Sequence, residues 1–254
     1  MLIVISSSKT LDFSKSLATK SHTIPVFINE SEELVGIIRQ FSVVELMKLL
    51  RISKSMAETN YNRYKKWNAS TKPNTSKIAL LTFKGEVFEN IKAGSLTASD
   101  FEFANRHLKI ISGLYGLLRP LDYMLPYRLE MGTKLLNNEG NNLYDFWKNR
   151  ITYELNKSLS EKNHNVILNL ASNEYFKVID QNKLQKPVLN ISFIQKQSGS
   201  YKNIGIYSKK ARGHMVNFII KNRITKTNDL KAFCEDGYLF NSHFSNEKEW
   251  VFTR

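Results

Sequence analysis

The stretch LIVIS at residues 2–6 runs directly into SSKTLD at residues 7–12, so an apolar segment ends abruptly in polar residues. Its β-branched Ile3, Val4 and Ile5 predict a strand that is buried on both faces. Two later apolar runs end in the same way, residues 78–83 before Lys84-Gly85-Glu86 and residues 165–171 before SNEYFK at 172–177. Loops at the carboxyl ends of parallel strands converge on one edge of a sheet, where ligands bind. The sequence therefore predicts an α/β fold with its functional residues at one sheet edge.

The rest of the chain alternates helical and extended patterns. Helices are predicted over 32–40, 43–67, from Thr97 to about 111, 143–159 and 209–223, and further strands over 188–194, 201–207, 238–240 and 250–252. Ser42 with Glu45, and Thr97 with Asp100, have the spacing of helix amino-terminal caps. No Pro/Gly/Ser-rich linker or internal repeat divides the chain. We expect a mixed α/β (α+β) fold in a single domain over residues 1–254, with a mixed central sheet and helices around it.

The charge is strongly positive, with 37 Lys+Arg against 23 Asp+Glu and a formal net charge of +14. The excess is uneven, because residues 48–84 and 196–231 each contain nine basic residues and one acidic residue. Such clusters favour a polyanionic partner. The alternative is a lysine-rich surface that only confers solubility.

Several classes of protein lack support in the sequence. No apolar run approaches the roughly 20 residues of a membrane span, and the amino terminus lacks the pattern of a signal peptide. Cys234 is the only cysteine, which fits a cytoplasmic location. The five histidines never fall at metal-ligand spacing, and no phosphate-binding glycine motif of the common nucleotide folds occurs. We therefore expect no metal site and no cofactor.

The segment SGLYGLLRPLDYMLPYRLEMG at residues 112–132 fits neither a helical nor a strand period. Its Arg119 and Arg128 carry planar donor forks that suit phosphate. One interpretation is a helix-hairpin-helix element, in which a helix turns through Gly113 and Gly116 and backbone N–H groups hold a phosphate. The other interpretation is a rigid crossover whose tyrosines cover the core.

The three strand ends predict one shared cleft if their strands are parallel neighbours. It would contain Lys9, Asp12, Lys84, Glu86, Asn173, Glu174 and Lys177. The basic helix would add Lys209, Lys210 and Arg212 as a further wall. The alternative is a set of independent surface ion pairs, each of which contributes little.

Six motifs together resemble one known family. They are SSSKTLDF at 6–13, FKGEVF at 83–88, SGLYGLLRPLD at 112–122, PYRLEMG at 126–132, NLASNEYFK at 169–177 and KKARG at 209–213. In order and approximate spacing they resemble the bacterial YaaA peroxide-stress family. The resemblance implies a cytoplasmic protein that limits hydrogen peroxide damage by lowering unincorporated iron. It also implies a positively charged cleft and a helix-hairpin-helix element that binds DNA.

Two functional hypotheses follow. The first is binding of DNA without sequence preference and with no obligate protein partner, driven by counterion release. Its predicted phosphate-binding residues are Lys9, Lys84, Gly113, Gly116, Arg119, Arg128, Lys177, Lys209, Lys210 and Arg212. The second is an enzyme acting on a nucleotide or nucleic acid, with Lys9, Asp12 and Glu174 as catalytic candidates and Lys209 and Arg212 nearby. Direct iron binding is a weaker third hypothesis, because ligand spacing is missing.

Overall fold

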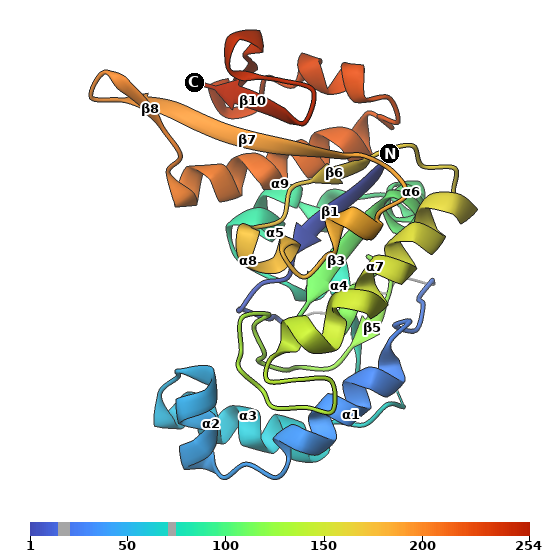
Figure 1. Ribbon diagram of the computed structural model, residues 1–254, viewed down its shortest axis with the longest axis vertical. Helices are drawn as coiled ribbons and strands as arrows, with labels where there is room; N and C mark the ends of the chain where they lie inside the picture. Colours follow the sequence, from blue (N-terminus) through green and yellow to red (C-terminus); the bar gives the residue numbers. More distant parts are fainter. Residues whose placement is uncertain (15–20, 71–74) are drawn as a thin grey trace.

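The computed structural model describes residues 1–14, 21–70 and 75–254. Lys72, one of the basic residues counted in 48–84, lies outside the described residues. The central feature is a mixed eight-stranded sheet with the order β4-β3-β1-β6-β7-β10-β9, and β8 pairs with β7 (Figure 1). The strands are β1 Leu2–Ser6, β3 Leu108–Ser112, β4 Gly116–Leu118, β6 Ile167–Asn169, β7 Val188–Gln197, β8 Ser200–Lys202, β9 Leu239–Phe240 and β10 Glu249–Thr253. The predicted mixed α/β architecture is confirmed.

The middle of the sheet is parallel and its margins are antiparallel. β1 pairs in parallel with β3 and β6, and the parallel series continues through β7 to β10. β4, β8 and β9 pair antiparallel with their neighbours. The apolar side chains of β1 are fully buried, as the LIVIS run predicts for a strand covered on both faces.

Helices cover the sheet and form a further group at one end of the molecule. They are α1 Ile28–Ile38, α2 Val43–Leu50, α3 Lys54–Lys66, α4 Ala79–Thr82, α5 Glu86–Ile91, α6 Ala98–His107, α7 Leu143–Glu161, α8 Asn173–Phe176 and α9 Gly205–Lys221, with short 3-10 turns at Ala93–Ser95, Gln181–Lys183, Thr227–Ala232, Glu235–Gly237 and Ser242–Phe244. α9 packs on α5 and β7, and α7 packs on β4. α1, α2 and α3 lie together at the end opposite α9 (Figure 1). No helix in the described ranges is long and apolar enough to cross a membrane.

Both predicted helix caps are confirmed. Ser42 and Glu45 form a reciprocal capping box on α2, and Thr97 and Asp100 form one on α6. The predicted helix over 43–67, however, is two helices. The chain turns at Arg51, which adopts a left-handed conformation with φ 53°, and Ser53 then caps α3. The helical apolar spacing continues across this break because both helices face the same core.

Two predicted strands are wrong in extent. Residues 78–83 are not a buried strand, because only Lys77–Ile78 (β2) are extended and α4 follows. β2 pairs with β5 Tyr123–Met124 in a separate two-stranded sheet. A short apolar run has no periodicity that separates a buried strand from a buried helical turn. The predicted strand over 201–207 ends at Lys202, and its last residues begin α9.

The helix-hairpin-helix element predicted at Gly113 and Gly116 does not form there. The helix opened by Thr97 ends at His107, and residues 108–112 form β3 beside β1. The chain then turns into β4, with Ile111 opposite Leu117 and Ser112 opposite Gly116. The spacing of Leu108 and Ile111 in the sequence extends the apolar face of α6, but both residues belong to β3 and are buried as part of the sheet. Residues 108–118 therefore form a β-hairpin.

The irregular segment 112–132 is a rigid crossover, as its second interpretation proposed. The hydroxyl of Tyr115 accepts hydrogen bonds from the Trp67 indole at 3.1 Å and from the Leu125 N–H at 2.9 Å. Gly113 and Gly116 are buried, and each is packed too closely for a side chain. A Cβ at 113 would overlap the backbone of Leu129. Gly116 has φ 63°, and its Cβ would lie 2.6 Å from the Trp147 ring. These glycines serve packing and offer no exposed turn to a phosphate.

Candidate functional site

The loops after β1 and β6 meet at the carboxyl edge of the sheet. The two strands are parallel neighbours, with Val4 opposite Asn169. Just beyond them, Ser172 donates its N–H to the Ser6 hydroxyl at 2.8 Å, and the two hydroxyls lie 3.2 Å apart. The polar ends SSK and SNEYF are therefore joined at one place, as their positions after two apolar runs indicated.

The third predicted loop reaches the same place by another route. The Lys84 N–H donates to the Thr10 carbonyl at 3.0 Å, and the Asp12 N–H donates to the Thr82 carbonyl at 2.8 Å. An antiparallel bridge between Leu11 and Phe83 lies between these bonds. Residues 83–86 are thus attached to the loop after β1 although they follow no strand of the main sheet.

The three loops and α9 enclose a cavity of about 460 Å³, which we call the strand-end pocket. It is lined by Ser6, Ser7, Ser8, Lys9, Lys84, Gly85, Glu86, Val87, Phe88, Leu170, Ser172, Glu174, Tyr175, Lys209 and Arg212. The lining combines cations, hydroxyl groups and an apolar wall. It brings together six residues of the predicted cleft: Lys9, Lys84, Glu86, Glu174, Lys209 and Arg212.

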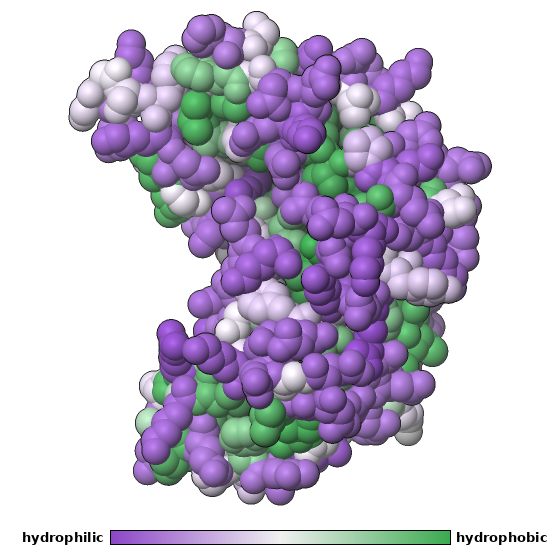
Figure 2. All heavy atoms as spheres, viewed as in Figure 1, coloured by the Kyte–Doolittle hydropathy of each residue, from purple (hydrophilic) through white to green (hydrophobic). Residues whose placement is uncertain are grey.

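A second cavity of about 750 Å³ adjoins the first between α2 and residues 128–134, and we call it the α2 groove. Its lining is Lys9, Phe41, Glu45, Lys48, Leu49, Leu50, Arg51, Arg128, Glu130, Gly132, Thr133, Lys134 and Glu174. Lys9 and Glu174 line both cavities, so the two form one cleft. Figure 2 shows the molecule hollowed on this side between its two ends, with hydrophilic residues around the opening.

Three cations of the cleft, Lys9, Lys84 and Arg128, have a carboxylate partner, and so does Lys210 nearby. Glu130 receives both Arg128 at 2.7 Å and Lys9 at 3.4 Å. Lys84 lies 3.5 Å from Asp12, and Lys210 lies 3.8 Å from Glu86. These ion pairs join different segments, because Lys84 pairs with Asp12 of the loop after β1, and Glu86 of its own loop pairs with Lys210 of α9.

In the strand-end pocket, Lys209 and Arg212 differ from Lys9 and Lys84, which have carboxylate partners. Within residues 1–14, 21–70 and 75–254, neither the Lys209 nor the Arg212 side chain makes a hydrogen bond or an ion pair. The Arg212 Nε atom is buried without a partner, and burial lowers the pKa of the guanidinium.

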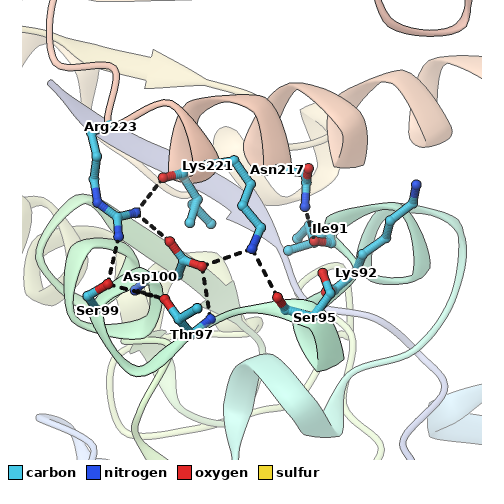
Figure 3. A network of polar contacts seen from close by, with 10 residues as sticks. Ile91, Lys92, Ser95, Thr97, Ser99, Asp100, Asn217, Lys221 and Arg223 are labelled. Atoms are coloured by element: carbon cyan, nitrogen blue, oxygen red, sulfur yellow. Dashed lines mark hydrogen bonds and ion pairs between the residues drawn. The ribbon is translucent and has the colours of Figure 1, made fainter.

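α9 is fixed by a polar clasp at its carboxyl end (Figure 3). The Asp100 carboxylate lies 2.9 Å from Lys221 Nζ and 2.7 Å from Arg223 Nη1, and it accepts the Thr97 N–H at 2.9 Å. Although burial alone would raise it, the pKa of Asp100 is lowered by its hydrogen bonds from Thr97, Lys221 and Arg223. Asn217 donates to the Ile91 carbonyl at 2.7 Å. The helix that carries Lys209 and Arg212 is therefore held in one position.

Two ionisable groups near the cleft have shifted pKa values. Hydrogen bonds from Ser14, with a smaller effect of Lys77 and Lys84, lower the pKa of Asp12 to about 2. Asp12 lines a separate hollow of about 590 Å³ with these two lysines. Burial raises the pKa of Tyr175 to about 12, against the effect of a hydrogen bond with Ser7. At neutral pH Asp12 is a fixed anion and Tyr175 a neutral hydrogen-bonding group.

Some predicted phosphate-binding residues lie away from the cleft. Arg119 is paired with Asp122 at 2.9 Å and lines a hollow with Lys109, toward the end where β3 begins. The Lys177 ammonium lies 4.3 Å from the Tyr144 ring centroid and lines neither cavity. Asn173 is exposed at the start of α8. The reversal of the chain in the β3–β4 hairpin carries Arg119 to the opposite edge of the sheet.

The α2 groove contributes cations that the sequence analysis did not assign to the site. Lys48, Arg51 and Lys134 are exposed and line the groove. The only sequence feature that pointed to Lys48 and Arg51 was the basic cluster over 48–84, which does not include Lys134. That cluster gave no indication that α2 faces residues 128–134.

The fold and the cleft define a mixed α/β protein with a cationic cleft at the carboxyl edge of its parallel strands. A family model described as peroxide stress protein YaaA matches residues 1–244. The chain therefore belongs to the YaaA peroxide stress protein family, as its motifs indicated.

Proposed function

We propose that this protein acts in the peroxide stress response by binding duplex DNA in the basic cleft without reading its sequence. The main observation is the continuity of the α2 groove with the strand-end pocket through Lys9. Exposed cations along such a groove bind phosphates and release counterions, which supplies most of the affinity of non-specific DNA binding. The net charge of +14 supports the same partner.

The β-hairpin found at Gly113 and Gly116 changes how the DNA would be held. The backbone groups near Gly113 and Gly116 are buried, so side chains must make the phosphate contacts. Lys48, Arg51 and Lys134 are exposed on the α2 groove and suit this role. They are positioning contacts to phosphate and carry no base specificity.

The family resemblance also supports a cytoplasmic role in lowering unincorporated iron, and we include this role in the proposal. No group of three or more His, Cys, Asp or Glu side chains in the described ranges is arranged to hold a metal ion. We therefore infer that the effect on iron follows from DNA binding. A peroxide survival assay with DNA-binding variants tests this link.

The DNA proposal is tested by titrating a labelled duplex at several salt concentrations. A triple variant Lys48→Gln, Arg51→Gln and Lys134→Gln should reduce the slope of log affinity against log salt by up to about 2.7, from about 0.9 per phosphate contact. The three side chains are exposed, so the fold should be unaffected.

The matched control is Lys157→Gln, Lys162→Gln and Lys186→Gln. These lysines are equally exposed and lie toward the edge where β6 begins, away from the cleft. The control removes the same charge and should retain nearly the full salt slope and protection from peroxide. An affinity that does not depend on salt, or equal losses in both triples, would overturn the proposal.

A further inference from the structure

The strand-end pocket differs in kind from the α2 groove that it adjoins. Its volume of about 460 Å³ falls in the range of about 300–1,000 Å³ that small-molecule sites occupy. A DNA duplex is too wide to enter this pocket, because its major groove alone is about 12 Å wide. The pocket therefore suits one small unit, whereas the groove suits a long polyanion.

Arg212 indicates the charge of that unit. Its Nε atom is buried, and it lacks any hydrogen-bond or ion-pair partner in the described part of the chain. Arg212 as a whole is half-buried, and burial of an unpaired guanidinium nitrogen is unfavourable unless an acceptor such as an anion receives it. Lys209 lies three residues earlier on the same helix, so the two side chains point to the same side. Together they form an unoccupied pair of donors to an anion, and the planar fork of Arg212 suits a phosphate.

The rest of the lining indicates what is attached to the phosphate. Ser6, Ser172 and Tyr175, which carry hydroxyl groups, are among the residues that line the pocket, and a hydroxyl that already has one partner can still bond to a sugar. Phe88 and Leu170 are buried residues that contribute an apolar wall, against which a flat ring could lie. This combination of an anion site, hydroxyl donors and an apolar wall matches a phosphate, a sugar and a base.

We propose that the strand-end pocket binds a single nucleotide, with its phosphate on Arg212 and Lys209 and its base toward Phe88 and Leu170. The proposal rests on the proposed DNA function, because Lys9 is shared with the groove in which the duplex would lie. The nucleotide has two possible sources with the same chemistry. It is either a nucleotide extruded from the bound strand, as in enzymes that take a base out of the stack, or a free mononucleotide.

The decisive variant is Arg212→Met, which keeps an unbranched apolar stem and removes the charged guanidinium. Binding of free nucleoside monophosphates, measured by calorimetry, should weaken at least 10-fold. In a duplex carrying 2-aminopurine at a mismatch, the fluorescence increase on extrusion should be lost. Arg106→Met is the matched control, because Arg106 is exposed and lines neither cavity of the cleft. It removes the same charge and should leave both nucleotide readouts unchanged.

The readouts separate the two sources and the two proposals. Monophosphate binding alone assigns the pocket to free nucleotides, and the fluorescence change alone assigns it to an extruded one. If wild-type protein shows neither, or binds inorganic phosphate as tightly as a monophosphate, the nucleotide pocket is overturned. Salt-dependent duplex binding would survive that result. If Arg212→Met does not fold, Lys209→Met replaces it, because Lys209 is exposed and its substitution should not affect folding. Lys209→Met should also weaken monophosphate binding.

Discussion

Gly213 of α9 lies directly against the backbone of Val87 in α5, so closely that a Cβ at position 213 would overlap the Val87 carbonyl oxygen. The neighbouring atom is backbone and cannot rotate away. Gly213→Ala should therefore lower the free energy of unfolding by about 1–3 kcal/mol, the usual cost of overpacking. Urea denaturation measures this change.

Gly36 provides the matched control for Gly213. It lies inside α1, and its Cβ would meet nothing within 4 Å. Gly36→Ala should raise the free energy of unfolding by about 0.5–1 kcal/mol, because Ala loses less backbone entropy in a helix. If the two variants behave alike, α9 is not packed on α5 as tightly as the structure shows.

The close contact at Gly213 illustrates what the sequence could and could not predict. KKARG at 209–213 indicated a basic helix with an inward-facing side, and that helix is present. The contact of Gly213 with α5 could not be predicted, because residues 78–86 resemble a strand followed by a polar loop and gave no indication of a helix there. The buried strands β1 and β6 were predictable because their apolar runs are rich in β-branched residues, whereas the run at 78–83 has Ala79, Leu80 and Leu81 at its centre.

The site was predictable to the same extent as the strands that carry it. Lys9 and Glu174 follow β1 and β6, so their proximity follows from the parallel pairing of those strands. Arg119 was misplaced because the prediction continued a helix through Ile111, where the chain forms β3 and then reverses. The capped helix before it and the apolar face shared with Phe101 favoured that error. Cations of the α2 groove depend on how distant helices pack, which periodicity does not encode.

The Asp100 clasp should make a large contribution to stability for a single carboxylate. Its side chain is almost fully buried, and it bonds to Lys221 and Arg223 as well as capping α6. Asp100→Asn removes the charge that these donors share, so the free energy of unfolding should fall by about 1–3 kcal/mol. Asp229→Asn is the control, because Asp229 is exposed, and it should change stability by less than about 0.5 kcal/mol. A near-neutral Asp100→Asn would show that the clasp contributes little.

The buried His164 should make stability depend on pH. Its Nδ1 lies 3.2 Å from the Met1 amino group, and its Nε2 donates to the Arg106 carbonyl at 3.2 Å. Burial, together with the nearby Met1 ammonium, His107 and Lys109, lowers the pKa of His164 to about 4. The unfolded chain binds a proton near pH 6.5, whereas the folded chain does not until about pH 4. Stability should therefore be full above pH 6.5 and fall as the pH drops toward 4.

The test is urea denaturation at several pH values between 7 and 4. His164→Gln removes one of the groups that titrate in this window, so the loss of stability per pH unit should become smaller. It should not vanish, because burial also lowers the pKa of His107. An unchanged pH dependence in His164→Gln would show that the imidazole is protonated equally in both states.

Glu130 should restrain DNA binding, because it occupies two cations of the cleft. Its carboxylate lies 2.7 Å from Arg128 Nη2 and 3.4 Å from Lys9 Nζ. A phosphate must compete with this carboxylate for both donors. Glu130→Gln keeps the shape of the side chain and removes its charge, so both cations become available while the Arg128 Nη1 bond to the Lys9 carbonyl still holds the arginine in place. Duplex affinity at low salt should rise several-fold, and the salt slope should steepen by up to about two.

Glu139→Gln is the matched control, because Glu139 pairs with Arg150 outside both cavities of the cleft. It removes the same charge from the protein and should raise affinity only slightly through the change in net charge. Fluorescence anisotropy with a labelled duplex at several salt concentrations measures both variants. If Glu130→Gln binds duplex no more tightly than Glu139→Gln, Lys9 and Arg128 do not contact phosphate. The bound duplex would then contact the other cations of the α2 groove, Lys48, Arg51 and Lys134.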